Sequence, residues 1–272
     1  MAQITIGCSH NKCTFCSMYK DKKFSIRPLE EVLEDFALAR QSYKRVEKIF
    51  LADGDALVLP NDYLVTVLQY IKKHFPECKR VAVYATAANI LNKSMAELQE
   101  LQQLGLGIAY LGLESGSERI LEVVKKKIST ADMVVACKRL REAGIQSSVT
   151  MISGLGGKAL WQEHALESAK IVSEMNPDYL GLLTLMVAKG TEIYEQIHNR
   201  EIELLNPLEV AQETKLFLEN LSVTNCVFRS NHASNYLVLK GTLPADQQKL
   251  VRQIDQAIHQ KNGFRNELLR GL

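Results

Sequence analysis

The chain has 272 residues, of which 46% are hydrophobic, and a formal net charge of +2. A core of this size suits one α/β barrel as well as two domains, and so small a charge does not indicate a nucleic-acid partner. The N-terminus lacks a secretory apolar stretch, and no segment approaches the roughly 20 apolar residues that cross a bilayer. Cys78, Cys137 and Cys226 are widely scattered and show no disulfide framework. We therefore expect a cytoplasmic protein without a membrane partner.

The first predicted element is a short strand over residues 4–6, which ends at Gly7, a residue suited to a sharp turn. Three cysteines follow within nine residues: Cys8, Cys13 and Cys16. So short a loop can direct three thiolates at one centre. The sequence therefore predicts a metal site at the carboxyl end of the first strand.

Two kinds of metal centre fit these three cysteines. Cys-x2-Cys with a nearby histidine is a common zinc arrangement, so His10 could serve as a fourth ligand in a purely structural site. Three sulfurs also suit an iron-sulfur cluster in which one iron has no protein ligand and can bind a substrate or cofactor. Spacing by itself leaves both alternatives open.

Short apolar runs alternate with longer amphipathic ones along the chain. After the run at 4–6, strands are predicted at 48–52, 80–86, 107–113, 145–152 and 179–186, and helices at 28–43, 61–74, 94–104, 130–143 and 160–175. Six strands with five intervening helices imply a parallel sheet with right-handed crossovers, two units short of an eight-stranded barrel.

The predicted fold class is therefore α/β, a partial (β/α)6 TIM-like barrel with a C-terminal helical extension. Helices are predicted at 206–221 and 243–260, on either side of an irregular polar stretch. We expect two domains, a barrel core over residues 1–190 and an extension over 191–272 that packs on it.

Polar residues follow several of the predicted strands at their carboxyl ends, where function collects in parallel α/β proteins. They include Asp53-Gly54-Asp55 after the second strand, Glu114-Ser115-Gly116-Ser117 after the fourth and Ser153-Gly154-Leu155-Gly156-Gly157 after the fifth. Each segment would face the rim that carries the cysteine loop.

With these motifs, residues 2–190 resemble the radical S-adenosylmethionine (SAM) superfamily, whose core is a partial barrel of six βα units with a three-cysteine loop after the first strand. The resemblance implies that Cys8, Cys13 and Cys16 hold a 4Fe-4S cluster and that SAM chelates the fourth iron. Phe15 matches the aromatic residue that packs near the adenine. Four residues separate the first two cysteines here, whereas three are most common in the family.

The resemblance also implies which residues contact SAM: Asp53, Gly54, Asp55, Glu114, Ser115, Lys127, Ile152, Leu185 and Met186. Residues 53–55 occupy the place of the family's Gly-Gly-Glu motif, which holds the methionine amino group largely through backbone carbonyls. A lysine of 125–127, for which we choose Lys127, would neutralise the carboxylate. Ordinary alternatives are a turn at 53–55, a solvated helix end at 125–127 and a core residue at Ile152.

The implied chemistry is reductive cleavage of SAM to a 5′-deoxyadenosyl radical that abstracts hydrogen from a substrate C–H bond. We therefore expect an enzyme, classed as an oxidoreductase, with a reductant such as flavodoxin or ferredoxin as its partner. The open iron is essential to this chemistry, so we expect that His10 is not a ligand. The alternative is a noncatalytic zinc or iron-sulfur binding barrel protein.

The predicted substrate site is the polar stretch 228–236. Arg229 would hold a carboxylate or phosphate, His232 would move a proton, and Tyr236 would donate hydrogen or relay an electron. A turn that caps neighbouring elements is the competing interpretation. We expect no auxiliary cluster, because no second group of cysteines follows, and we find no room in 272 residues for a cobalamin-binding domain.

Overall fold

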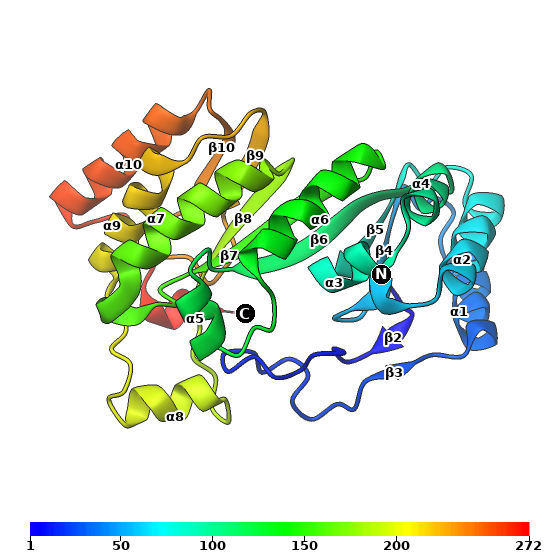
Figure 1. The fold of residues 1–272 in the computed structure, drawn as a ribbon, viewed down its shortest axis with the longest axis horizontal. Coiled ribbons are helices and arrows are strands. Elements are labelled where there is room, and N and C mark those ends of the chain that lie inside the picture. The colour runs from blue at the N-terminus through cyan, green and yellow to red at the C-terminus, as the bar shows by residue number, and fades with distance from the viewer. Residues whose placement is uncertain (272) are drawn as a thin grey trace. The chain divides into compact units, whose positions relative to one another are not determined.

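The computed structural model describes residues 1–271 as a mixed α/β fold with an eight-stranded, mostly parallel sheet and a separate two-stranded ribbon (Figure 1). The strands of the large sheet are β1 (Ala2–Gln3), β4 (Lys48–Ala52), β5 (Arg80–Ala85), β6 (Leu106–Glu114), β7 (Gln146–Ser153), β8 (Tyr179–Thr184), β9 (Cys226–Ser230) and β10 (Leu239–Leu243). The ribbon pairs β2 (Thr5–Ile6) with β3 (Ser25–Ile26) in antiparallel orientation.

Ten α-helices and two 3-10 helices connect these strands in the described chain. The helices are α1 (Leu29–Ser42), η1 (Ala56–Val58), α2 (Asn61–His74), α3 (Ala87–Asn92), α4 (Met95–Gln103), α5 (Glu118–Val123), α6 (Thr130–Glu142), α7 (Gly157–Met175), α8 (Glu192–His198), α9 (Pro207–Asn220), α10 (Gln247–Gln260) and η2 (Glu267–Leu269).

The chain divides into two compact units. The first contains residues 1–11, 18–111 and 135–147, and the second contains residues 12–17, 112–134 and the chain from Ser148 onward. The division passes through the cysteine loop, β6, α6 and β7. The predicted domain boundary at residue 190 lies elsewhere and stays a prediction.

The first unit is built on the parallel strands β1, β4, β5 and β6. Side chains alternate between the two faces of a strand, and the buried face of β4 and β5 carries Ile49, Leu51, Val81 and Val83. Helix α2 buries Leu64, Val67, Leu68 and Ile71, a spacing that gives one apolar helix face. Figure 1 shows α2 beside α1, with which it packs.

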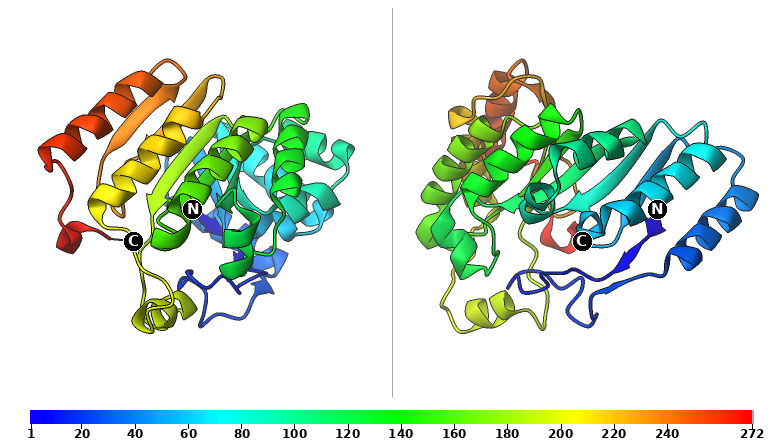
Figure 2. Two further views of the ribbon diagram at one scale, coloured as in Figure 1. Left: turned by 60° about the vertical axis from the view of Figure 1, so that its left-hand side comes forward. Right: turned by 45° about the vertical axis from the view of Figure 1, so that its right-hand side comes forward.

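The second unit is built on β8, which pairs in parallel with both β7 and β9, while β10 pairs antiparallel with β9. Helices α7, α9 and α10 lie side by side along these strands (Figure 2). Helix α9 begins with Pro207 and a reciprocal pair of hydrogen bonds between Asn206 and Glu209, which satisfy backbone donors at the helix start. These caps fix where the helix begins.

The predicted elements are largely confirmed, and β4 and α2 agree with the predicted ranges to the residue. Two details were wrong. The run at 4–6 is not one strand, because Ala2–Gln3 joins the large sheet and Thr5–Ile6 joins the ribbon. The tail is not wholly helical or irregular, because β9 and β10 lie in it. β9 alternates buried and more exposed residues, as a strand with one covered face does.

Candidate functional site

None of the three predicted ligands forms a disulfide. Cys8, Cys13 and Cys16 are all partly buried, and Cys8 belongs to the first unit while the other two belong to the second. No group of three His, Cys, Asp or Glu side chains among residues 1–271 is arranged to hold a metal ion. The donor set nevertheless fits an iron-sulfur cluster, because three soft thiols within nine residues are its usual protein ligands.

In the first unit, the turn after β4 holds the start of the cysteine loop. The Asp53 carboxylate accepts hydrogen bonds from the Gln3 amide at 3.1 Å and the Gly7 backbone N–H at 3.2 Å, and also from the Tyr19 hydroxyl. The Ser9 hydroxyl donates to the Asp55 carboxylate. Both acidic side chains thus contact the loop, and the contact of residues 53–55 with SAM stays a prediction.

Tyr19 also contributes to the contact between the turn after β4 and the cysteine loop. This residue was not identified from the sequence. Its ring is 8% exposed, and burial raises the pKa of its hydroxyl, with the bond to Asp53 raising it further. The ring lies against Gly54: a Cβ at residue 54 would come within 2.5 Å of Tyr19 Cε2 and 3.1 Å of Cys8 Cβ. Glycine is therefore required at this position for the turn to approach the cysteine loop so closely.

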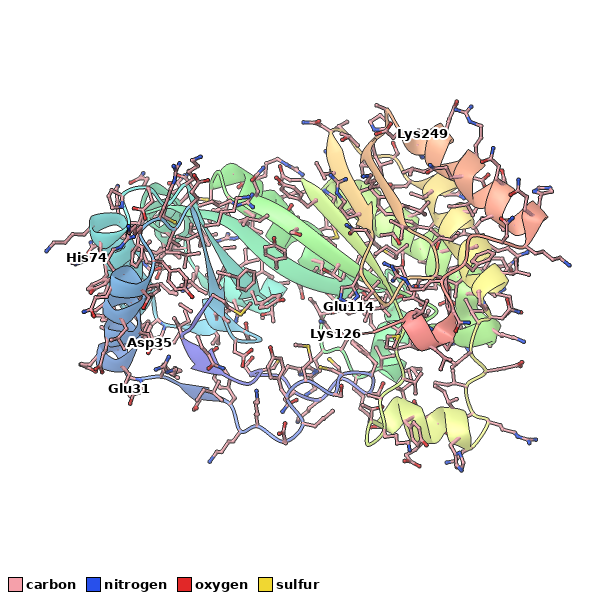
Figure 3. The ribbon with its side chains drawn as sticks, turned by 180° about the vertical axis from the view of Figure 1, so that it is seen from behind. Glu31, Asp35, His74, Glu114, Lys126 and Lys249 are labelled. Atoms are coloured by element: carbon pink, nitrogen blue, oxygen red, sulfur yellow. The ribbon has the colours of Figure 1, made fainter. Side chains whose placement is uncertain are left out.

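In the second unit, Glu114 forms an ion pair with Lys126, with 2.9 Å between Oε1 and Nζ (Figure 3). Both side chains are largely buried, and Glu114 has a left-handed backbone with φ of 64°. A Cβ at Gly112 would come within 2.0 Å of Glu114 Oε1, so the pair depends on that glycine. The predicted Lys127 is exposed, and Lys125 pairs instead with Glu192. Lys126 is therefore the lysine beside the Glu114-Ser115 pair.

Ser115 is fully buried, and its hydroxyl lies 2.8 Å from Nδ1 of His164 on α7. The other ring nitrogen of His164 lies 3.0 Å from the backbone oxygen of Ile152. His164 thus joins the turn after β6 to the end of β7, which are two of the segments predicted to contact SAM. Neither His164 nor its connection was predicted.

Glu213 on α9 extends this buried network. Its Oε1 accepts hydrogen bonds from the Ser153 hydroxyl and, at 2.8 Å, from the Gly154 N–H, and it lies 4.0 Å from His164 Nε2. Its Oε2 has no hydrogen-bond partner among residues 1–271. Burial raises the pKa of Glu213 despite these contacts, because the charged form of a buried carboxyl is poorly solvated. The network fixes the turn that leads from β7 into α7.

Three residues predicted to lie near the adenine belong to one apolar cluster in the second unit. Ile152 and Leu185 are buried in it, and Phe15 packs against it. The N–H of Thr14 donates to Val124 O at 3.0 Å, which holds this part of the cysteine loop on the cluster. The structure thus places Phe15, Ile152 and Leu185 together, and their contact with the adenine stays a prediction.

The backbone of Leu185 is already engaged on both sides. Its N–H donates to Ser153 O at 2.9 Å, and its carbonyl accepts from Arg270 Nη2 at 2.9 Å. Arg270, which sequence reasoning missed, also lies over the Tyr236 ring with 4.0 Å between its Cζ and the ring centroid. The contacts of Leu185 and Met186 with the adenine stay a prediction.

The three predicted substrate residues have different surroundings. Arg229 is exposed on β9 and donates to the carbonyls of Phe228 and Gly241. His232 is exposed, with Nδ1 3.0 Å from the Ser234 hydroxyl. Tyr236 is 8% exposed, donates to Glu267 at 2.6 Å and has a pKa raised to about 12, mainly by burial. Their role in substrate binding stays a prediction.

Within the same stretch, Asn235 and Ser234 bind the end of β8. The Asn235 amide donates to Leu182 O at 2.9 Å and its oxygen accepts from the Thr184 hydroxyl at 3.0 Å. The Ser234 hydroxyl accepts from the Thr184 N–H. These bonds match the competing interpretation, in which Asn and Ser cap neighbouring elements.

Comparison with known proteins identifies the family. Residues 3–169 match the radical SAM superfamily, and this match covers more than half of the chain. The chain therefore belongs to the radical SAM superfamily of enzymes, whose members bind a 4Fe-4S cluster and SAM. No helix of residues 1–271 is long and apolar enough to span a membrane.

Individual relatives are distant. The chain is 26% identical over 232 residues to an uncharacterized protein of Methanocaldococcus jannaschii, with 80% of this chain and 70% of that protein covered. It is 25% identical to an uncharacterized methyltransferase of Pyrococcus horikoshii, covering 70% of this chain but 40% of the relative.

Solved structures share the fold. The radical SAM methyltransferase TsrM from Kitasatospora setae superposes with a TM-score of 0.60 at 16% identity, over 73% of this chain and 39% of that one. Methylornithine synthase (PylB) gives 0.57 at 14% identity, over 94% and 80%. The predicted α/β partial barrel is confirmed.

Proposed function

We propose that this protein holds a 4Fe-4S cluster through Cys8, Cys13 and Cys16 and uses it to cleave SAM reductively and abstract hydrogen from a substrate. The observation that supports this most is the donor set: three cysteine thiols in nine residues, none of them in a disulfide, within the part of the chain that matches the family. Three protein ligands leave one iron available to SAM.

When bound, the reduced cluster supplies the electron that breaks a carbon-sulfur bond of SAM. The protein's part is to position the reactants and exclude water. Backbone carbonyls of residues 53–55 would accept from the SAM amino group, since both acidic side chains there already contact the loop. Lys126 would neutralise the methionine carboxylate, and the cluster formed by Phe15, Ile152 and Leu185 would cover the adenine.

The predicted reaction class, oxidoreductase, is one of several that the family supports. The similar proteins include a methyltransferase and a synthase, so the shared fold favours neither oxidation nor group transfer. Radical SAM enzymes need a reductant and a substrate, and we propose flavodoxin or ferredoxin as the reductant. No cysteine of residues 1–271 is paired in a disulfide, which suits a reducing cytoplasm, the location we propose.

Reductive SAM cleavage is the experiment that tests this function. Anaerobically reconstituted protein is reduced with dithionite in the presence of SAM, and 5′-deoxyadenosine and methionine are measured by mass spectrometry. Wild type should release both products, and Cys13→Ala should release neither. Cys78→Ala, which removes a partly buried thiol outside the loop, is the matched control and should behave as wild type. Release by Cys13→Ala at the wild-type rate would contradict the proposal.

A further inference from the structure

The first unit carries an aromatic cluster that neither the predicted site nor the proposed function uses. Phe50 on β4, Tyr84 on β5 and Tyr110 on β6 lie on the same face of three neighbouring strands, which Figure 1 shows side by side. Ring centroids are 4.7 Å apart for Phe50 and Tyr84, 5.3 Å for Phe50 and Tyr110 and 6.0 Å for the two tyrosines. The rings are inclined by 55° to 71°, the edge-to-face range that aromatic pairs prefer.

A small residue allows these rings to meet. Strands β4 and β6 lie on either side of β5, so their backbones are about 10 Å apart. Ala82 of β5 stands opposite Phe50 in the register, and its short side chain leaves space above β5. Phe50 and Tyr110 therefore reach across β5 towards each other, and the three rings form one continuous surface.

This surface is not part of the core. Tyr84 is 39% exposed, and Phe50 and Tyr110 are partly exposed. Ile108 and Ala82 on the same face are buried at 1% and 7% exposure, so the aromatic rings form the partly exposed portion of this face, while on the other face Ile49 and Val83 are at most 6% exposed. Exposed clusters of large apolar side chains are uncommon away from binding sites, since they forfeit the free energy of burial.

The aromatic surface lies beside the turn that holds the cysteine loop. Leu51 stands opposite Val83 in the register, so Tyr84 and Asp53 follow this pair at the carboxyl ends of two neighbouring strands. Asp53 in turn accepts from Tyr19 and from Gly7, the residue before Cys8. A ligand resting on Tyr84 would therefore be close to the start of the cluster loop.

Two cations stand on the same face, towards the amino ends of the strands. Lys48 is directly opposite Arg80 in the register, and they lie two residues before Phe50 and Ala82, which is about 7 Å along the strands. Neither cation forms a salt bridge with a carboxylate in residues 1–271, and the nearby Glu47 pairs with Arg45 and Lys79. The face thus joins an aromatic surface to available positive charge.

We infer that Phe50, Tyr84 and Tyr110 bind a planar aromatic substrate whose anionic group is met by Lys48 and Arg80. Inclined rings give a flat ligand both stacking and edge contacts, and the two cations orient its acidic end away from the cysteine loop. The inference rests on the proposed function in one respect, namely that the bound aromatic ligand is the substrate. Binding itself is measurable without any reaction.

The test uses three probes in isothermal titration calorimetry. They are 2-naphthoate, its saturated analogue decahydro-2-naphthoate and the neutral 2-naphthylmethanol. We expect wild-type protein to prefer 2-naphthoate about tenfold over the saturated acid, from the aromatic contacts, and also over the alcohol. Tyr84→Leu should abolish the preference for the aromatic acid over the saturated one, and Tyr84→Phe should retain it because the ring remains. Lys48→Gln should reduce the preference over the alcohol.

Tyr43→Leu is the matched control, because Tyr43 is 62% exposed at the end of α1 and should not affect either preference. Equal binding of the aromatic and saturated acids, unchanged binding by Tyr84→Leu, or no binding of 2-naphthoate at millimolar concentration would overturn the inference. Titrations of cluster-loaded and cluster-free protein separate it from the proposed function. A preference for 2-naphthoate in cluster-loaded protein that does not cleave SAM would support the aromatic site and refute the catalytic proposal; SAM cleavage by protein without that preference would do the reverse.

Discussion

Gly54→Ala is the substitution that probes most directly how the turn after β4 meets the cysteine loop. The added methyl carbon would lie 2.5 Å from Tyr19 Cε2, 3.0 Å from Tyr19 Cζ and 3.1 Å from Cys8 Cβ. Carbon atoms in contact are ordinarily about 3.5–4.0 Å apart, so the Tyr19 ring would have to move by about 1 Å. That ring is 8% exposed and its hydroxyl is bound to Asp53, which restricts the movement.

The expected cost is that of forcing a methyl group into a packed site, about 1–3 kcal/mol. It should appear as lower free energy of unfolding of the metal-free protein in urea, and as lower iron content after anaerobic reconstitution. Gly181→Ala is the matched control on β8, because its added carbon would find its nearest neighbours at 3.8 and 3.9 Å. The control should change the unfolding free energy by less than about 0.5 kcal/mol.

A second variant separates crowding from other effects of alanine. Gly54→Ala combined with Tyr19→Leu removes the ring that the methyl group would strike, so iron content should rise above that of Gly54→Ala alone. If Gly54→Ala loaded as much iron as wild type and unfolded at the same urea concentration, the close approach of turn and loop would play no part in holding the cluster.

Three further predictions concern the second unit. Gly112→Ala should displace the Glu114–Lys126 pair, which its Cβ would strike at 2.0 Å, and weaken SAM binding about tenfold in calorimetry; unchanged affinity would remove Lys126 from the site. Burial raises the pKa of Glu213 above 4.5, so the folded protein binds this proton more tightly than the unfolded chain. Wild-type stability should therefore fall relative to Glu213→Gln as the pH rises above 4.5, and parallel urea profiles would contradict this. Cys226 is fully buried with a pKa raised to about 12, so iodoacetamide should leave it unmodified in folded protein while alkylating Cys16, as peptide mass spectrometry would show.

The sequence was sufficient for the repeating part of the fold. Strong periodicity marks elements such as β4 and α2, whose buried residues recur at strand and helix spacing. The strands of the tail were missed because the exposed positions of β9 include Arg229 and polar residues follow it, so that its alternation is hidden. The sheet partner β8 makes this segment a strand, and a partner is not visible in a local pattern.

Residues of the candidate site were predictable where a motif within one segment of the sequence identifies them. The cysteine loop and the apolar residues Phe15, Ile152 and Leu185 were identified from motifs. Tyr19 was not identified, and Lys126 was one of three candidate lysines but was not chosen, because their partners lie 34 and 12 residues away in the chain and only folding brings them together.

Buried polar residues on helices gave a signal that was overlooked. Glu213 lies among Val210, Thr214 and Phe217 on the covered face of α9, and His164 adjoins the buried Ala165 on α7. A charged or titratable residue on an apolar helix face must find a partner when buried, and this would have marked both as members of a network. The partners themselves, Ser153 and Ser115, could not be identified without the structure.

Electron paramagnetic resonance of anaerobically reconstituted, reduced protein, with metal analysis, tests the central claim most directly. We predict about four irons per chain and a cluster signal that changes when SAM is added, because one iron has no protein ligand. The signal should be lost in Cys8→Ala. A protein that takes up one zinc through its cysteines and His10, or a cluster whose signal SAM does not alter, would contradict the account.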